Sequence, residues 1–215
     1  MNRTAVAVIK RYLLLLAGLA VMAFGVAFSI KASLGTSPIS SVPYVVSLFS
    51  PLTVGTATII MHCVFILLQI LILRRKYHLI QLMQLPVAFC FGYLTDFGVW
   101  AVQNMECHTY WQQWLICLIG ILLVAAGVSL EVKAGVVVLA GEGVVLAICK
   151  VLPIKFGYMK VLFDVTLVVI ACILSLVFTG HLQGVREGTV AAAIMVGLIA
   201  KQLGKILSRW KLEEI

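Results

Sequence analysis

Charged residues are scarce in this sequence of 215 residues. They make up 11% of the chain, whereas soluble domains carry about 25%, and only 8 of them are acidic. Hydrophobic residues make up 63%. So few charges cannot cover the surface of a water-soluble fold. The composition therefore excludes a soluble domain and predicts an integral membrane protein.

Motifs of common catalytic sites are absent as well. The sequence has no HExxH, GxSxG, GxxxxGK[ST] or GxGxxG pattern, so metalloproteases, α/β-hydrolases, P-loop NTPases and dinucleotide-binding enzymes have no sequence support. The six cysteines form no CxxC pair and no cysteine–histidine spacing typical of a metal site. We therefore expect no enzyme activity, no cofactor and no metal.

The net charge of +8 does not indicate nucleic-acid binding. The basic residues stand between apolar runs, where they determine how the chain is oriented across a membrane. The lipid bilayer is thus the expected partner, and nucleic acid is not.

Long apolar runs predict the fold class. A span needs about 20 apolar residues, and continuous runs in lipid must be helical because no water is present to satisfy a free backbone amide. Two shorter apolar segments, 35–50 and 136–150, follow the first and fourth runs. We expect an all-α polytopic protein with six transmembrane helices, at 12–30, 54–73, 82–103, 113–130, 158–179 and 188–206.

The chain also repeats itself. Glycine and proline fix backbone shape, so a register that matches several of them is poorly explained by apolar composition alone. The pattern indicates an internal duplication. A shift of 102 residues without a gap superposes Gly18 on Gly120, Gly25 on Gly127, Lys31 on Lys133, Pro51 on Pro153 and Gly55 on Gly157.

Charge placement favours six spans over eight. With six spans and a cytoplasmic N-terminus, the basic cluster at 74–76 lies in the cytoplasm, whereas it would lie outside if the two short segments also crossed. Each repeat then holds three spans, an odd number, so the second repeat is inverted relative to the first. Both termini are expected in the cytoplasm. The short segments are expected to be re-entrant or broken, since they contain Gly35, Pro38, Pro43, Gly141 and Gly143.

These boundaries give the domain organisation. We expect a first membrane repeat at 1–104, an external connector at 105–112, and a second membrane repeat at 113–215 that ends in a cytoplasmic tail.

Polar residues inside spans are costly and mark candidate positions for substrate binding or coupling. His62 and Asp164 correspond under the 102-residue shift, and they form either a titratable pair facing a central cavity or an interhelical hydrogen bond. Glu142 stands between two glycines and is either a cation ligand or a loop acid paired with a lysine. Asp96 lies well inside the third span. Three hydroxyls of the first short segment complete the set: Ser37, Ser40 and Ser41.

Two further charges stand at the expected external start of the sixth span. Arg186 and Glu187 form either a local ion pair or cap, or part of an external mouth.

Two blocks of the first half carry a family resemblance, GLAVMAFGVAFSIKASLGTSPISSVPYVVS and VGTATIIMHCVFILLQILI. A third block, in the second half, is GVREGTVAAAIMVGLIAK. Together they resemble the YczE/YyaS/YitT-type family of bacterial multi-span membrane proteins. The resemblance implies a multi-pass protein of the bacterial plasma (inner) membrane with the duplicated architecture. It supplies no substrate and no catalytic residue.

These features predict a small transporter or permease. It would move a small solute through a cavity between inverted repeats, with proton or cation coupling as an option. The alternative is a non-transporting accessory or scaffold protein with a dry core. The sequence leaves the solute unidentified and leaves a homo-oligomer open.

Overall fold

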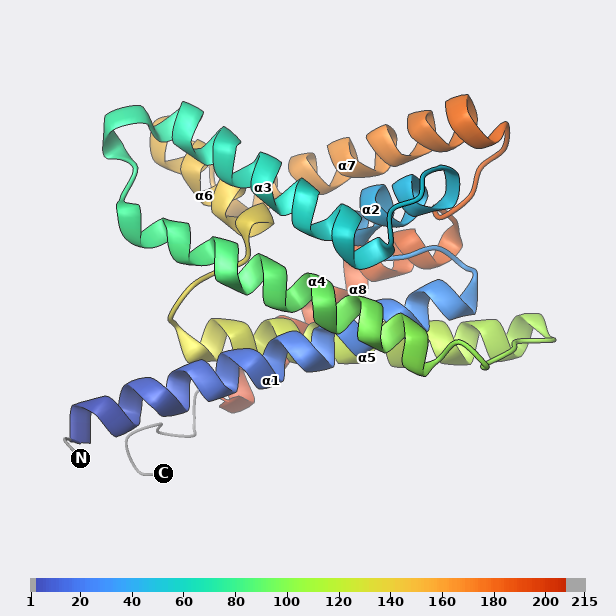
Figure 1. The fold of residues 1–215 in the computed structure, drawn as a ribbon, viewed down its shortest axis with the longest axis horizontal. Helices are drawn as coiled ribbons and strands as arrows, with labels where there is room; N and C mark the ends of the chain where they lie inside the picture. The colour runs from blue at the N-terminus through green and yellow to red at the C-terminus, as the bar shows by residue number, and fades with distance from the viewer. Residues whose placement is uncertain (1–2, 208–215) are drawn as a thin grey trace.

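A computed structural model describes residues 3–207, with side chains from Ala7 onward (Figure 1). Within this range the chain is helical and contains no strand, which confirms the all-α prediction. The cytoplasmic tail expected beyond Leu207 lies outside the described residues. The helices are α1 (Arg3–Ala32), α2 (Pro38–Phe49), α3 (Val54–Leu73), α4 (Gln84–Ala101), α5 (Tyr110–Ala134), α6 (Ala140–Val151), α7 (Phe156–Thr179) and α8 (Glu187–Leu207), with two short 3₁₀ turns, η1 (Arg74–Lys76) and η2 (Leu79–Met83).

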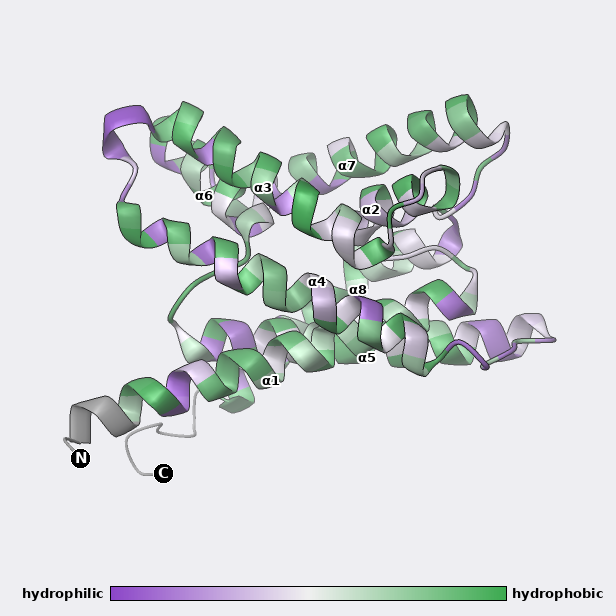
Figure 2. Cartoon of the chain, viewed as in Figure 1, coloured by the Kyte–Doolittle hydropathy of each residue, from purple (hydrophilic) through white to green (hydrophobic). Residues whose placement is uncertain are grey.

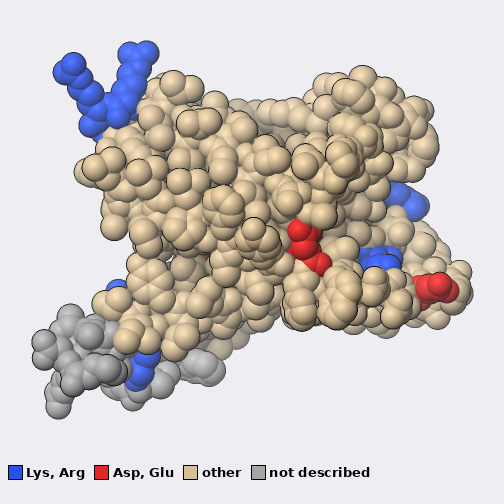
Figure 3. Space-filling model, viewed as in Figure 1, with Lys and Arg blue, Asp and Glu red and all other residues tan. Residues whose placement is uncertain are grey.

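Six of these helices are long and apolar enough to cross a membrane, as predicted: α1, α3, α4, α5, α7 and α8. In Figure 1 they run alternately from left to right and from right to left, so that α1 begins and α8 ends at the same end of the molecule. Hydrophilic residues concentrate in the turn from α3 to α4 and in the connection from α4 to α5 (Figure 2). Charged side chains gather toward the two ends (Figure 3). The chain is a multi-pass membrane protein.

The two short segments form helices α2 and α6, each of 12 residues and too short to span a bilayer. The breaks fall before these helices, at 33–37 and 135–139. Gly35 lies in the first break and Pro38 directly follows it, as expected, whereas the other three positions do not interrupt a helix. Pro43 lies inside α2, and Gly141 and Gly143 lie in the first turn of α6. These two glycines serve close packing, because a Cβ at Gly141 would collide with Ile39, and one at Gly143 with Gln69.

The 102-residue repeat is visible in the helices. The bounds of α2 and α6 differ by this shift at both ends, α3 and α7 start at equivalent positions, and α1 and α5 end at equivalent positions. The residues after α1 and α5 are equivalent too, since Ser33 and Gly135 both adopt left-handed backbone with φ of 56° and 60°. From the end of the first helix to the start of the third, the second copy thus repeats the first, including the backbone conformation after the helix end.

Glycines hold α1 and α5 together. The two helices run antiparallel in Figure 1 and pack more extensively than any other pair. A Cβ built on Gly25 would lie 2.8 Å from the carbonyl oxygen of Gly120, and one built on Gly127 would lie 2.6 Å from that of Gly18. Because the repeat places Gly18 on Gly120 and Gly25 on Gly127, these are two copies of one contact. The helix axes approach closely because these positions carry no side chain.

Most of the other helix contacts come in equivalent pairs. Helix α4 packs on α1 as α8 packs on α5, and α2 packs on α7 as α6 packs on α3. Helix α4 also packs on α3, where Gly55 and Gly92 approach each other, but α8 makes no comparable contact with α7. In the second half, a Cβ at Gly157, the counterpart of Gly55, would meet no atom within 4 Å. The same holds for Gly197, which aligns with Gly92 only when three residues are inserted into the 102-residue register. The second half is therefore open where the first half is closed.

Candidate functional site

A cavity of about 330 Å³ lies at the centre of the molecule, and all eight α-helices contribute to its wall. Most of the wall is apolar, with residues such as Met22, Val26, Phe91, Val124 and Val128. The polar side chains that line it come from both halves: Ser37, Ser40, Thr58, His62, Glu131, Glu142, Lys160 and Asp164.

Helices α2 and α6 bring their N-terminal ends to this cavity. In Figure 1, α2 lies toward the right of the molecule and α6 toward the left. Their first turns meet at the centre, where Ile39 packs against Gly141. Each chain segment enters the bundle through an irregular stretch, at 33–37 or 135–139, and such backbone is tolerated at membrane depth only inside protein or beside a water-filled space.

Glu131 is the most deeply buried acid of the site. Its side chain is on α5, the residue is 1% exposed, and its Oε1 atom accepts a hydrogen bond of 2.6 Å from the backbone amide of Leu139. The left-handed Gly135 turns the chain back after α5 so that this amide reaches a residue eight positions earlier. The Oε2 atom of Glu131 has no hydrogen-bond partner.

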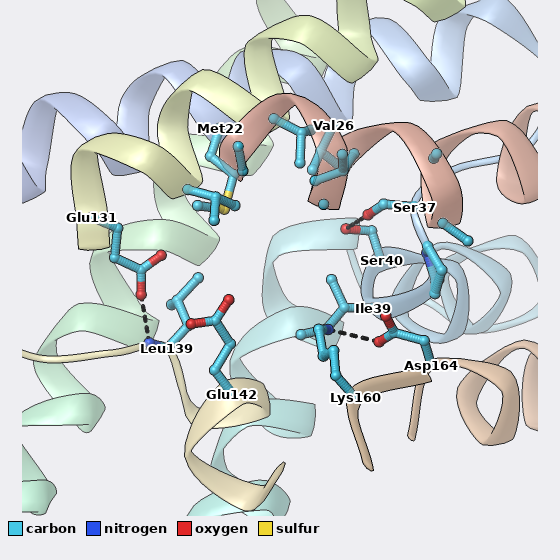
Figure 4. A pocket seen from close by; sticks show the side chains of 18 of the residues that line it. Met22, Val26, Ser37, Ile39, Ser40, Glu131, Leu139, Glu142, Lys160 and Asp164 are labelled. Carbon is cyan, nitrogen blue, oxygen red and sulfur yellow. Dashed lines mark hydrogen bonds and ion pairs between the residues drawn. The ribbon is translucent and has the colours of Figure 1, made fainter. Parts of the chain in front are cut away.

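Glu142 and Asp164 approach the cavity from α6 and α7. Glu142 lies in the first turn of α6, and Figure 4 shows its carboxylate turned toward the same space as that of Glu131. Asp164 is held by an ion pair of 2.7 Å with Lys160, one turn earlier on α7. Both members of this pair line the cavity (Figure 4).

His62 reaches the cavity from α3 and is 1% exposed. Its ring lies between those of Phe65 and Phe91, with centroid distances of 6.1 Å to each, and its Nδ1 atom has no hydrogen-bond partner. His62 and Asp164 thus line one cavity, as the repeat predicts. They are not hydrogen-bonded to each other, because Asp164 pairs with Lys160 instead.

The predicted serines divide between the cavity and the protein interior. Ser37 and Ser40 line the cavity and share a hydrogen bond of 3.1 Å. Ser41 is buried beside it, and its hydroxyl donates to the carbonyl oxygen of Pro38 at 2.6 Å, which stabilises the first turn of α2.

Asp96 lies outside the cavity wall. Its carboxylate accepts hydrogen bonds from the hydroxyl of Thr53 at 2.6 Å and from the backbone amide of Gly55 at 2.7 Å. Both donors belong to the start of α3, where the first amides of a helix have no partner within the helix. Asp96 therefore fastens α4 to the N-terminus of α3.

Replacing Asp96 by alanine is expected to lower the free energy of unfolding by about 1–2 kcal/mol, the usual cost of a lost helix cap. Asp96→Asn keeps an acceptor and should lose less. Thermal unfolding of the purified protein in detergent measures both variants. An unchanged melting temperature in Asp96→Ala would contradict the capping role.

Arg186 and Glu187 form a local ion pair with a distance of 3.3 Å. Arg186 also donates to the carbonyl oxygen of Ser33 at 3.1 Å, which ties the α7–α8 loop to the end of α1. Neither residue lines the central cavity.

Two charged residues of the cavity were not predicted from the sequence. Glu131 follows the expected fourth span by one position, so it reads as an end-of-span residue, whereas α5 continues to Ala134 and carries it into the interior. Lys160 reads as one of the cytoplasmic charges that set topology, whereas it lies within α7 and pairs with Asp164. The signal for Lys160 was its spacing of four residues from an acid within an apolar run.

A second cavity, of about 380 Å³, lies between the α5–α6 loop and the turn before α4. Its wall includes Gln81, Gln84 and Lys150. Among the residues of the described chain that line either cavity, Glu131 is common to both. This carboxylate therefore stands in the partition between the two spaces.

The central cavity is open at its side, between α7 and α8. Four of its wall residues are exposed on the molecular surface: Phe156, Val161, Ala193 and Gly197. Gly197 lies at the middle of α8, far from either helix end. In a bilayer that α8 spans, the part of the opening at Gly197 would lie at the depth of the hydrocarbon.

Comparison with known families gives one match. Residues 9–205 match DUF6198, a family of unknown function. No curated protein and no solved structure matches the chain.

Proposed function

The chain belongs to DUF6198, a family of unknown function, and we propose from its cavity that the protein is a membrane carrier for a small solute. The observation that carries this proposal is the central cavity itself, which has buried polar groups from both halves and irregular backbone at two helix breaks. Carriers build their solute sites in this way. A non-transporting accessory protein with a dry core, the alternative, does not need a cavity of about 330 Å³.

The proposal includes an inverted relation between the two halves. The antiparallel course of α1 and α5 and the paired helix contacts support it. Both termini would then lie in the cytoplasm of a bacterium, with the protein in the plasma membrane. Kinship with YczE/YyaS/YitT-type proteins is part of the same proposal and rests on the three sequence blocks, two in the first half and one in the second.

The open α7–α8 pair suggests how the carrier would alternate. In the closed first half, α3 meets α4 at Gly55 and Gly92, whereas Gly157, the counterpart of Gly55, and Gly197 on α8 meet no neighbouring helix. Closing α7 on α8 while α4 leaves α3 would exchange the conformations of the halves. The cavity would then open on the other side, as alternating access requires.

Water should reach the cavity in at least one of these states. In a variant without native cysteines, Ser40→Cys is expected to react with a membrane-impermeant thiol reagent, because Ser40 lines the cavity. Ala125→Cys, fully buried between helices, is the unreactive control, and Glu106→Cys, exposed in a loop, is the reactive one.

Solute uptake into proteoliposomes then tests the function directly. A panel of small solutes that raise the melting temperature of the purified protein should include at least one that exchanges across the membrane faster than in protein-free vesicles. An unreactive Ser40→Cys together with no exchange of any stabilising solute would refute the carrier proposal.

A further inference from the structure

We propose that the central cavity binds an organic ammonium ion, whose charged head lies between Glu131 and Glu142 and whose apolar body lies on the surrounding wall. This inference names the solute class of the proposed carrier. Its transport consequence rests on the proposed function, whereas the binding does not.

The charges of the wall favour a cation. Three carboxylates line the cavity, and Lys160 is the one basic side chain among its lining residues in the described chain. Lys160 contacts Asp164 directly and attracts Glu142 from a distance, so it neutralises at most one of the three. The N-terminal ends of α2 and α6 each add the equivalent of about half a positive charge. Counting the three carboxylates as ionised and His62 as neutral leaves the site with an excess of about one negative charge.

The unpaired oxygen of Glu131 requires a hydrogen-bond donor. Its Oε2 atom is buried and without a partner, while Oε1 is already used by Leu139. Buried acceptors in folded proteins are nearly always paired. A primary or secondary ammonium group supplies both the charge and the N–H that this atom lacks, and charge-assisted hydrogen bonds of this type are the strong ones.

The remainder of the wall is suited to a hydrocarbon body and not to a hydrated inorganic ion. Apolar residues from several helices form most of it, including Val26, Phe91 and Val124. A volume of about 330 Å³ falls within the range of about 300–1,000 Å³ that is typical for organic ligands. The phenyl ring of Phe91 could additionally contact a cation by its face.

Because Glu131 lies in the partition between the two cavities, the cation has a second path to the site. A head group bound there is reachable from the second cavity as well, through a wall that carries the amides of Gln81 and Gln84. The same carboxylate can therefore receive the cation from one space and release it to the other.

Calorimetric titration of the purified full-length protein in detergent tests this inference with three probes that share one phenylethyl skeleton. These are 2-phenylethylammonium, the uncharged 2-phenylethanol and the anion 3-phenylpropionate. The cation is expected to bind, with an affinity at least tenfold higher than that of the alcohol, and the anion is expected not to bind. Glu131→Gln and Glu142→Gln should each weaken cation binding at least tenfold. Glu106→Gln, which changes an exposed acid in the α4–α5 connection, should leave it unchanged.

The inference is overturned if the anion or the alcohol binds as well as the cation, if no cation binding occurs at millimolar concentration, or if both glutamine variants bind like the wild type. The comparison of the three probes on the wild type decides the matter even if a variant fails to fold. Cation binding without uptake into proteoliposomes would keep the site and refute the carrier. Uptake of an anion without cation binding would refute the ammonium site and keep the carrier.

Discussion

Replacing Gly25 by leucine is expected to abolish folded protein. A Cβ at this position would lie 2.6 Å from the backbone nitrogen of Val124 and 2.8 Å from the carbonyl oxygen of Gly120, and backbone atoms of a helix cannot move aside. Overpacking of a core by a few atoms costs about 1–3 kcal/mol, and here a whole side chain would separate the two central helices. Because a domain is stable by only about 5–15 kcal/mol, we expect no monodisperse protein after extraction in detergent.

Gly204→Leu is the matched control for this variant. Gly204 is also a helical glycine, but a Cβ there meets no atom within 4 Å. The control should elute like the wild type in size-exclusion chromatography. A folded, monodisperse Gly25→Leu protein would show that α1 and α5 do not approach as described.

Replacing Gly157 by leucine is expected to leave the fold intact and to reduce transport to the background of protein-free vesicles. Gly157 faces open space and does not line the cavity, so the added side chain disturbs neither packing nor the solute site. Its first-half counterpart Gly55 touches Gly92, where a Cβ would collide. A leucine at 157 should therefore prevent α7 from closing on α8 and hold the protein in the open form described here.

Three measurements separate this effect from others. The melting temperature and the binding of 2-phenylethylammonium should match those of the wild type, whereas uptake into proteoliposomes should be lost. Gly204→Leu again serves as the control and should transport normally. Normal uptake by Gly157→Leu would contradict the proposed closure of α7 on α8.

Much of the fold could be predicted from the sequence, because a lipid environment permits few kinds of sequence pattern. The span at 54–73 is predicted to the residue, because apolar length is nearly the only requirement for crossing a bilayer. The duplication also follows, since glycines that permit close helix packing reappear at a fixed spacing. Pro43 was expected to interrupt a helix, but it lies inside α2. One proline removes only one backbone hydrogen bond, and α2 tolerates that loss.

The candidate site was only partly predictable, because a side chain's role depends on what faces it. His62, Asp164, Glu142, Ser37 and Ser40 were found as polar groups within apolar segments, and all line the cavity. The same rule also selected Asp96, whose partners are helix amides and a hydroxyl that no sequence pattern joins to it. Glu131 was missed because its depth depends on where α5 ends, which the Gly135 turn decides.

Because the central cavity opens between α7 and α8, a solute can enter the site from the membrane, where its concentration differs from that in water. Since the wall residues Phe156, Val161, Ala193 and Gly197 are exposed on the two apolar helices, a solute with an apolar body can also arrive from the membrane. Each methylene group favours transfer from water into the bilayer by about 0.8 kcal/mol, which is about a fourfold enrichment. Within a homologous series of amines, an apparent affinity calculated from the aqueous concentration should therefore rise with chain length. This increase is expected even when the contacts in the cavity stay the same. The bilayer acts as a reservoir that concentrates the solute before the protein binds it.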